Sequence, residues 1–363
     1  MKPLRLFLCL SAFVLSSALL SAAEFQVRAE RVGAGPIVDA SLLPGEEGQS
    51  INGPSLIRVP DWVSNPLGRY YLYFAHHAGK YVRLAYADRL EGPWKLHEGG
   101  VLALDAQTSV SGHIASPQAV IDEKNRRVYL FYHGGRPQRK TAGAESEAEK
   151  GQVSGVAVSG DGLAFKSLER VVGPAYLQVF SHDGRWFALN HGGTLRETAR
   201  LGEPFEPLAK VIGPDIIAAV DPAKLGEPGA MPKENRPTEG PFRYTMRHVG
   251  VDVAGDKLVV YFSCVGHRPE RILCTVIDLT GDPAQWRAQG AYEVLRPEQA
   301  WEGADLPLAY SRGGISTERV RELRDPAVFR DGEKAWLVYT GAGEHALGLA
   351  ALRYQDNASE DAR

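Results

Sequence analysis

Short apolar runs, each about five residues long and separated by turn residues, recur along almost the whole chain. Near the C-terminus, Ala327–Phe329 and Ala335–Tyr339 flank an Asp331-Gly332 pair, and a Gly-rich loop and another apolar run follow. Asp-Gly between two apolar runs is a strong signal for a β-hairpin. Helical periodicity is almost absent. The pattern therefore predicts a series of antiparallel hairpins.

The same pattern occurs five times. Each unit has an inner run, an aromatic-rich second run and a third run, and in several units a turn with an aromatic residue precedes a fourth run. The units begin near residues 53, 116, 174, 248 and 325. Five units of four short strands predict an all-β fold, a five-bladed β-propeller with four-stranded antiparallel blades. We expect a single domain at residues 24–354 and a polar tail at residues 355–363.

The first 23 residues differ from the rest. Lys2 and Arg5 precede an apolar segment at residues 6–20, and small residues follow at 21–23. This order of charge, apolar core and cleavage site is typical of a signal peptide. A membrane anchor is the weaker alternative because no stop-transfer pattern follows. We therefore expect a periplasmic or extracellular protein, a monomer with no membrane contact after cleavage.

Charge and cysteine content narrow the range of partners. The chain has 41 Lys and Arg against 44 Asp and Glu, a net charge of −3, and it has no basic stripe with interleaved aromatic residues. Nucleic acid is therefore not an expected partner.

Cys264 and Cys274 fall on adjacent predicted strands, and the compartment permits a disulfide. The spacing leaves bridged and free cysteines equally open and suggests no metal site.

Three short motifs carry a resemblance to a known group. They are Leu90-Glu91-Gly92-Pro93-Trp94 after the first unit, Thr238-Glu239-Gly240-Pro241, and Arg324-Asp325-Pro326 before the Trp336 run. With them the chain resembles the five-bladed propeller glycoside hydrolases, the group of the family 43 arabinanases and xylosidases and their fructan-cleaving relatives. The resemblance covers nearly the whole mature chain. It implies an oligo- or polysaccharide of plant or algal origin as substrate, cleaved by an inverting acid/base hydrolysis.

The resemblance also implies three carboxyl groups, and this chain departs from that pattern. The family's proton donor falls on Glu239. Its general base would precede the proline of the first unit, where Gly53 stands after Asn52, and the third carboxylate would precede the proline of the second unit, where Ser116 stands. Asp325 is the one Asp-Pro aspartate that remains at the repeated position. Its alternative role is structural, as an acceptor for backbone N–H groups at a strand start.

Histidines are the second candidate set, because equivalent positions in a propeller meet on one face around the axis. Several lie at the ends of second runs or just before an inner run, and a neutral imidazole can act as a base, as a partner for sugar hydroxyls or as a metal ligand. The expected substrate-binding residues are Asn52, His76, His77, His113, His133, His191, Arg247, His248, Arg312 and Arg324.

Three functions remain open at this point. The first is a secreted glycosidase with Glu239 as acid and Asp325, or a histidine-assisted water, as base. The second is a non-catalytic glycan-binding propeller, which the missing aspartates favour. The third is a polysaccharide lyase in which histidine removes a proton beside a uronate carboxylate. None requires a cofactor, and a structural calcium ion on the propeller axis stays an open alternative.

Overall fold

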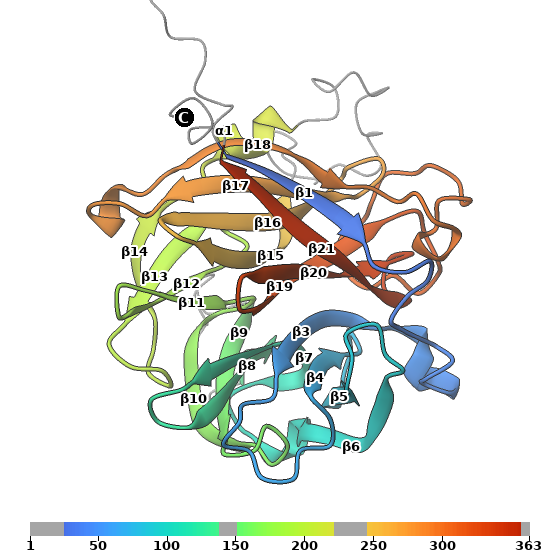
Figure 1. Ribbon diagram of the computed structural model, residues 1–363, viewed down its shortest axis with the longest axis vertical. Helices are drawn as coiled ribbons and strands as arrows, with labels where there is room; N and C mark the ends of the chain where they lie inside the picture. Colours follow the sequence, from blue (N-terminus) through green and yellow to red (C-terminus); the bar gives the residue numbers. More distant parts are fainter. Residues whose placement is uncertain (1–24, 138–150, 221–244, 357–363) are drawn as a thin grey trace, which may run out of the picture.

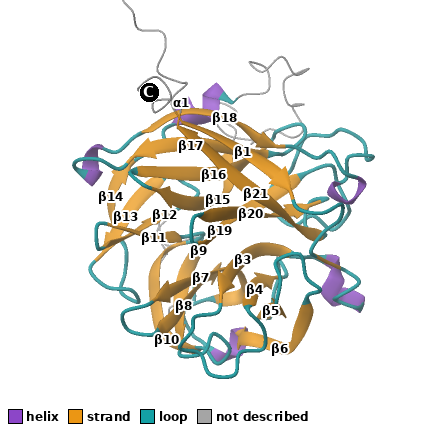
Figure 2. Cartoon of the chain, in the orientation of Figure 1, coloured by secondary structure: helices purple, strands orange, loops and turns teal. Residues whose placement is uncertain are grey.

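The structure, a computed structural model, describes residues 25–137, 151–220 and 245–356. Its strands form five antiparallel sheets placed as blades around one axis (Figure 1). The predicted five-bladed propeller is confirmed. Strands and loops make up most of the chain (Figure 2). Short helical segments lie between strands: η1 (Gly45–Gln49), η2 (Leu104–Ala106), α1 (Pro214–Ala219), η5 (Pro283–Gln285) and η6 (Ala300–Glu302).

Four blades are built from consecutive strands that follow one another from the axis outward. The first has β3 (Asn52–Arg58), β4 (Tyr70–Ala75), β5 (Tyr81–Ala87) and β6 (Lys95–Ala103). The second has β7 (Ser111–Asp122), β8 (Arg127–Gly135), β9 (Gln152–Ser159) and β10 (Lys166–Pro174). The third has β11 (Gln178–His182), β12 (Arg185–Leu189), β13 (Thr194–Thr198) and β14 (Glu206–Lys210). The fourth has β15 (Thr245–Ala254), β16 (Lys257–Val265), β17 (Ile272–Asp278) and β18 (Ala288–Leu295).

The fifth blade joins both ends of the described chain. It has β19 (Leu323–Asp331), β20 (Lys334–Gly341), β21 (Ala346–Asp356) and, as its outer strand, β1 (Phe25–Arg31), and β2 (Val38–Asp39) also pairs with β21. Phe25 pairs with Asp356 and Arg31 with Ala350. Strand β21 therefore takes up the first two residues of the predicted tail. The N-terminal strand completes the last blade, so β21 is paired on both sides and β1 becomes the outer edge.

Turn chemistry explains where the hairpins bend. Between β11 and β12, Asp183 and Gly184 both adopt left-handed backbone conformations, with φ of 49° and 73°. A two-residue type I′ turn requires positive φ at both positions, which Asp and Gly tolerate best. The third unit was expected to begin near residue 174. Pro174 instead ends β10 of the second blade, and the inner strand of the third blade starts at Gln178.

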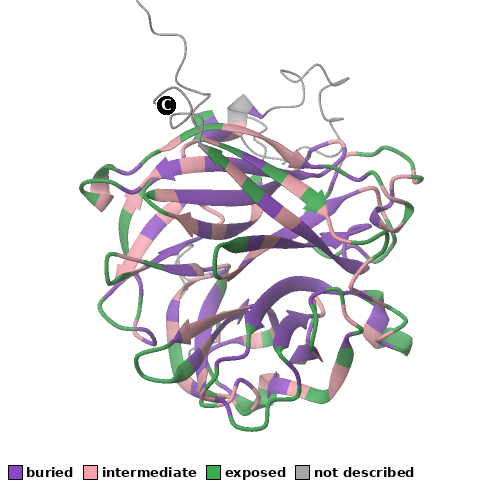
Figure 3. Cartoon of the chain, viewed as in Figure 1, coloured by how far each residue is buried: buried purple, intermediate pink, exposed green. Residues whose placement is uncertain are grey.

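The core lies in layers between neighbouring blades (Figure 3). Between the first and second blades, for example, Tyr71 and Tyr73 pack in one cluster with Leu130 and Tyr132. All six residues of β4 are buried, because a blade is covered on both faces. The inner strands β3, β7, β11, β15 and β19 contact one another in this order around the axis, and β19 returns to β3. Side chains at the ends of these strands are thus held on a rigid frame.

The two cysteines are free and buried. Cys274 on β17 faces Tyr261 on β16, three residues away from Cys264. At about 3.3 Å per residue, this offset separates the two cysteines by roughly 10 Å, which exceeds the Cα separation that a disulfide spans. In the described ranges, no helix has the length and apolar character needed to cross a bilayer.

Candidate active site at the mouth of the axis

Each inner strand presents one residue to the axis at the same level. In β3, β7, β15 and β19 the pairing register shifts around this residue, and in the third blade it lies just before β11. A small cavity of about 20 Å³ lies between these residues and is lined by all of them: Gly53, Ser116, Tyr176, His248 and Asp325. The equivalent positions predicted from the repeats therefore do converge.

The backbone at this level is strained. Ser116, Tyr176 and Asp325 have φ of 42°, 61° and 49°, in the left-handed region that side chains other than glycine rarely adopt. Each such residue costs on the order of 1–3 kcal/mol and persists where the surrounding structure holds it. Such outliers cluster at functional sites, so the axial ring is the first candidate.

Asp325, which is buried, pairs with the half-buried His248 across the fourth and fifth blades. Oδ1 of Asp325 contacts Nδ1 of His248, and Oδ2 accepts the Gly53 N–H at 3.4 Å. Asp325 is 3% exposed. Burial alone would raise the pKa of Asp325, but the charge and hydrogen bond of His248, followed by the charges of Arg247 and Arg324, hold it well below its usual value. The carboxylate is ionised at neutral pH.

Tyr176 lies among imidazole rings from three blades. Its ring centroid is 4.1 Å from that of His133, 4.2 Å from that of His248 and 5.0 Å from that of His191. His113 extends the cluster at 5.4 Å from His133. Within the described residues, Nδ1 of His133 and of His191 has no hydrogen-bond partner. Both Nδ1 atoms are buried, so the cluster contains two hydrogen-bonding groups that the described residues leave unsatisfied.

Burial sets the protonation of this cluster. It lowers the pKa of His133 well below the usual value and that of His191 to about 4, with a further contribution from the charge of His248. It also lowers the pKa of His113. The pKa of Tyr176 is raised to about 12, by burial and then by the charge of Asp325. At pH 7 these side chains are neutral hydrogen-bonding groups.

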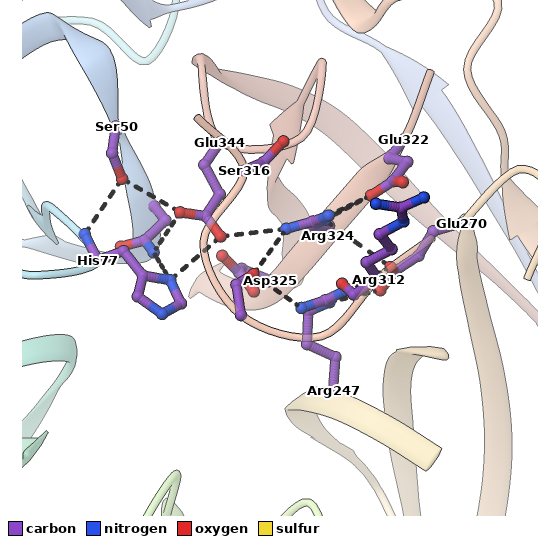
Figure 4. A network of polar contacts seen from close by, with 12 residues as sticks. Ser50, His77, Arg247, Glu270, Arg312, Ser316, Glu322, Arg324, Asp325 and Glu344 are labelled. Atoms are coloured by element: carbon purple, nitrogen blue, oxygen red, sulfur yellow. Dashed lines mark hydrogen bonds and ion pairs between the residues drawn. The ribbon is translucent and has the colours of Figure 1, made fainter. Parts of the chain in front are cut away.

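A band of buried ion pairs supports the site on the side of blades four and five (Figure 4). Arg247 donates to both carboxylate oxygens of Glu270, from Nε at 2.8 Å and from Nη2 at 2.9 Å. Arg324 donates to Glu322 at 2.7 Å and to Glu344 at 3.1 Å. Both guanidinium groups are buried and already paired. Their charges hold the strand ends in place and stabilise the nearby Asp325 carboxylate.

The band continues into the first blade through Glu344. Its Oε1 contacts Nδ1 of His77 at 3.2 Å, and its Oε2 accepts from Asn52 at 3.2 Å and from Ser50 at 3.1 Å (Figure 4). Asn52 is 2% exposed, and its Oδ1 has no partner among the described residues. The fifth and first blades thus meet through one carboxylate, which orients His77 and Asn52 at the mouth.

The structure places most of the predicted residues in one region, and within the described residues the side chains of His76 and Arg312 make no hydrogen bond or ion pair with the others there. Those brought together are Asn52, His77, His113, His133, His191, Arg247, His248, Arg324 and Asp325. The Nδ1 atom of His76 instead accepts the Ala78 N–H at 3.0 Å within its own turn. The side chain of Arg312 is exposed, and its carbonyl accepts from Arg247 at 2.5 Å. Glu239 lies outside the described residues.

Sequence reasoning missed Tyr176 and the three glutamates of the ion-pair band. Tyr176 is followed by Leu177, whereas Pro marks the axial position in the first, second and fifth units. Glu344 stands in the Gly-rich loop after β20, at the end of a second run, where the first three units carry histidines. The position of Glu344, equivalent to that of these histidines, was the signal in the sequence that could have identified it as a site residue.

The axial position of the first blade has no room for a side chain. A Cβ on Gly53 would lie 2.6 Å from Cα of Ser116 and 2.9 Å from its Oγ, and Gly53 has φ of 56°. The backbone of the second blade would have to move to admit one. This explains why glycine stands where the resemblance expects an aspartate.

Gly53→Asp is therefore expected to destabilise the protein and not to supply a base. Overpacking and left-handed strain together cost about 2–4 kcal/mol of unfolding free energy, measurable by urea denaturation. Gly255→Asp is the matched control, because Gly255 has φ of 59° and open space around it. A Gly53→Asp variant no less stable than the control would contradict the steric explanation.

Comparisons with known proteins agree with this architecture. The GH43_1 enzyme from Xanthomonas citri complexed with xylose superposes with a TM-score of 0.51 at 13% identity, over 87% of this chain and 89% of that one. CoXyl43, a GH43 beta-xylosidase/alpha-arabinofuranosidase from a compost microbial metagenome, superposes with a TM-score of 0.52 at 12% identity, over 90% and 94% of the two chains. At this identity the likeness shows the fold, a GH43-like five-bladed propeller.

One curated relative is close enough to define a family. "Uncharacterized protein R118" of Acanthamoeba polyphaga mimivirus is 33% identical over 321 residues, which cover 84% of this chain and 83% of the viral protein. The chain therefore belongs to the same family as the mimivirus protein R118, and it has the fold of a GH43-like five-bladed propeller. No protein-family model matches the sequence.

Proposed function

We propose that the protein is a glycosidase that hydrolyses an oligo- or polysaccharide at the mouth of the propeller axis. The observation that carries this proposal is the buried, ionised Asp325 paired with His248 in a ring of axial residues. The fold it shares with GH43 enzymes supports a saccharide as ligand, since one such neighbour is complexed with xylose. Export through the segment at residues 1–23 and action as a secreted monomer are parts of the same proposal.

His248 is suited to activate water. Its Nδ1 is held by the carboxylate of Asp325, which favours the tautomer with the proton on Nδ1 and leaves Nε2 as the acceptor. A water molecule would transfer a proton to Nε2 while its oxygen attacks the anomeric carbon. The carboxylate of Asp325 stabilises the imidazolium that forms. The leaving oxygen takes its proton from an acid, for which the sequence predicts Glu239.

The neutral imidazoles would recognise the sugar. His133 and His191 each have an Nδ1 without a partner in the described ranges, and sugar hydroxyls can both donate to and accept from such atoms. No step needs a cofactor. Calcium takes six to eight oxygen ligands, and Asp325 is the one carboxylate that lines the axial cavity, already paired with His248. A structural calcium ion is therefore no part of this proposal.

A lyase is the less favoured enzyme. That reaction needs a cation to neutralise the uronate carboxylate, but Arg247 and Arg324 are already paired with glutamates. Asp325 and Glu344 would also repel a second carboxylate. A non-catalytic glycan-binding propeller is the stronger alternative, because Gly53 and Ser116 replace two carboxylates that the resemblance expects.

One experiment separates the three functions. The purified mature chain is incubated with a panel of plant and algal polysaccharides, and both reducing ends and absorbance near 235 nm, about where an unsaturated uronate absorbs, are followed. We expect reducing ends without absorbance. Absorbance would identify a lyase, and saturable binding without either product would identify a binding protein.

Glu239→Gln is expected to lower turnover by about 10²–10⁴-fold, the range for loss of a general acid, without changing the fold. The amide is isosteric but has no carboxylic proton to give. Glu333→Gln, at an exposed carboxylate, is the matched control and should keep full activity. Wild-type turnover in Glu239→Gln would remove this residue from the mechanism.

A further inference from the structure

The hydrolysis scheme gives no role to Tyr176, although this residue occupies the centre of the site. It supplies the axial position of the third blade and lines the small cavity together with His248 and Asp325. Its φ of 61° is unusual for an aromatic residue, whose Cβ crowds the backbone in that conformation. The fold tolerates this strain at a position where glycine would be relaxed.

The ring of Tyr176 is wedged between imidazoles from the second and fourth blades. The interplanar angles are 50° to His133 and 49° to His248, with centroid distances of 4.1 and 4.2 Å. His191 meets it edge-on, at 87° and 5.0 Å. The tyrosine ring therefore contacts His133, His191 and His248 at once, and none of them can turn freely without meeting it.

His248 needs two constraints to present a defined Nε2 atom. Its Nδ1 contact with Asp325 selects the tautomer, but a single contact at one ring atom leaves the ring plane free to rotate about it. The close, tilted contact with the Tyr176 ring removes that freedom. We assign the constraint to the aromatic ring, because the contact with His248 is a tilted ring-to-ring contact, at 49° and 4.2 Å between centroids.

We infer that Tyr176 is a positioning residue that fixes the ring plane of His248 and so directs its Nε2 atom into the axial mouth. The consequence for catalysis rests on the proposed hydrolysis, whereas the constraint on the imidazole is a property of the free protein. The two can fail separately, and the test measures both.

The test compares Tyr176→Gly with Tyr176→Phe. Glycine removes the ring and suits φ of 61°, so the backbone loses strain. Phenylalanine keeps the ring and removes the hydroxyl. On the panel polysaccharide that the wild-type protein hydrolyses fastest, we expect Tyr176→Gly to lower kcat roughly 10–100-fold with KM changed less than about threefold, the cost of a misplaced catalytic group. Tyr176→Phe should stay within about twofold of the wild type.

Imidazole ¹⁵N NMR of the free protein provides the second readout. The wild type and Tyr176→Phe should show one His248 tautomer with the proton on Nδ1, and Tyr176→Gly should show exchange-broadened His248 signals. Asp183→Gly is the control, because Asp183 is a left-handed residue in the same blade, with φ of 49°, far along β11 from the site. It should match the wild type in both measurements.

Several results would overturn the inference. One is a Tyr176→Gly variant with wild-type kcat and an unchanged His248 spectrum. Another is a loss of kcat in Tyr176→Phe as large as in Tyr176→Gly, which would assign the role to the hydroxyl. If the wild type hydrolyses nothing, the proposed function fails, and the NMR spectra of the two variants still decide whether Tyr176 positions His248.

Discussion

Replacing Asp325 by Asn is expected to lower kcat by about 10³–10⁴-fold, the size of effect seen when an aspartate that orients a catalytic histidine becomes an amide. Asn cannot stabilise the imidazolium of His248, and its amide group can hold the wrong tautomer by donating to Nδ1. Initial rates of reducing-end release by the purified variant measure the effect. Binding of the same saccharide by calorimetry should change far less, because Asp325 is 3% exposed and acts through His248.

Asp331→Asn is the matched control for this prediction. Asp331 is the last residue of the same strand, β19, whereas Asp325 is near its start, and Asp331 pairs with Arg58 at 3.0 Å. It should keep wild-type turnover. If Asp325 is solely a structural acceptor at a strand start, Asp325→Asn will unfold more easily and yet retain its kcat per folded molecule, which would contradict the catalytic assignment.

The pH dependence of stability gives an independent view of the same carboxylate. The folded-state pKa of Asp325 lies below its usual value of about 3.9. Its ionised form therefore stabilises the protein above that pH, and this contribution is lost as the pH falls. The Asn variant should accordingly lose less stability than the wild type between about pH 5 and pH 2.

The fold was predictable because of the repeats, but the way in which the ring closes was not predictable from them. Each blade carries its own hairpins, and the aromatic turns before β6, β10, β14 and β18 mark fourth strands within the repeated pattern. Strand β1 belongs to no repeat. It pairs with β21 at the other end of the chain, and only the unsatisfied edge of the last blade requires it. A local pattern carries no information about such a long-range pairing.

The candidate site was predictable as far as it follows from equivalent positions. The histidines at the ends of second runs converge because the blades share an axis. Tyr176 was not visible, since its importance depends on a left-handed backbone and on rings from three blades. The place of the carboxylate was predictable, because Asp325 is the one Asp-Pro aspartate at the repeated position. The reason that the first blade has no aspartate there was not predictable, because it depends on the close approach of Ser116 to Gly53.

The largest effect on stability is expected where the ring closes. Arg31, at the end of β1, donates to both oxygens of Glu302, at 2.7 and 2.9 Å. Glu302 is fully buried and also accepts from the Tyr339 hydroxyl at 2.8 Å. Arg31→Met would leave this carboxylate buried without its cation, which costs about 3–5 kcal/mol of unfolding free energy. Urea denaturation followed by tryptophan fluorescence measures the loss.

Two further variants decide whether the cause is the buried charge. Arg353→Met, on the neighbouring strand β21, removes an exposed guanidinium whose distance to Glu30 is 3.8 Å, and it should change the free energy by less than about 0.5 kcal/mol. Adding Glu302→Gln to Arg31→Met should restore part of the lost stability, because the unpaired charge is then gone. If Arg31→Met is no worse than Arg353→Met, β1 is held by its backbone pairing with β21, and the ion pair does not secure the closure.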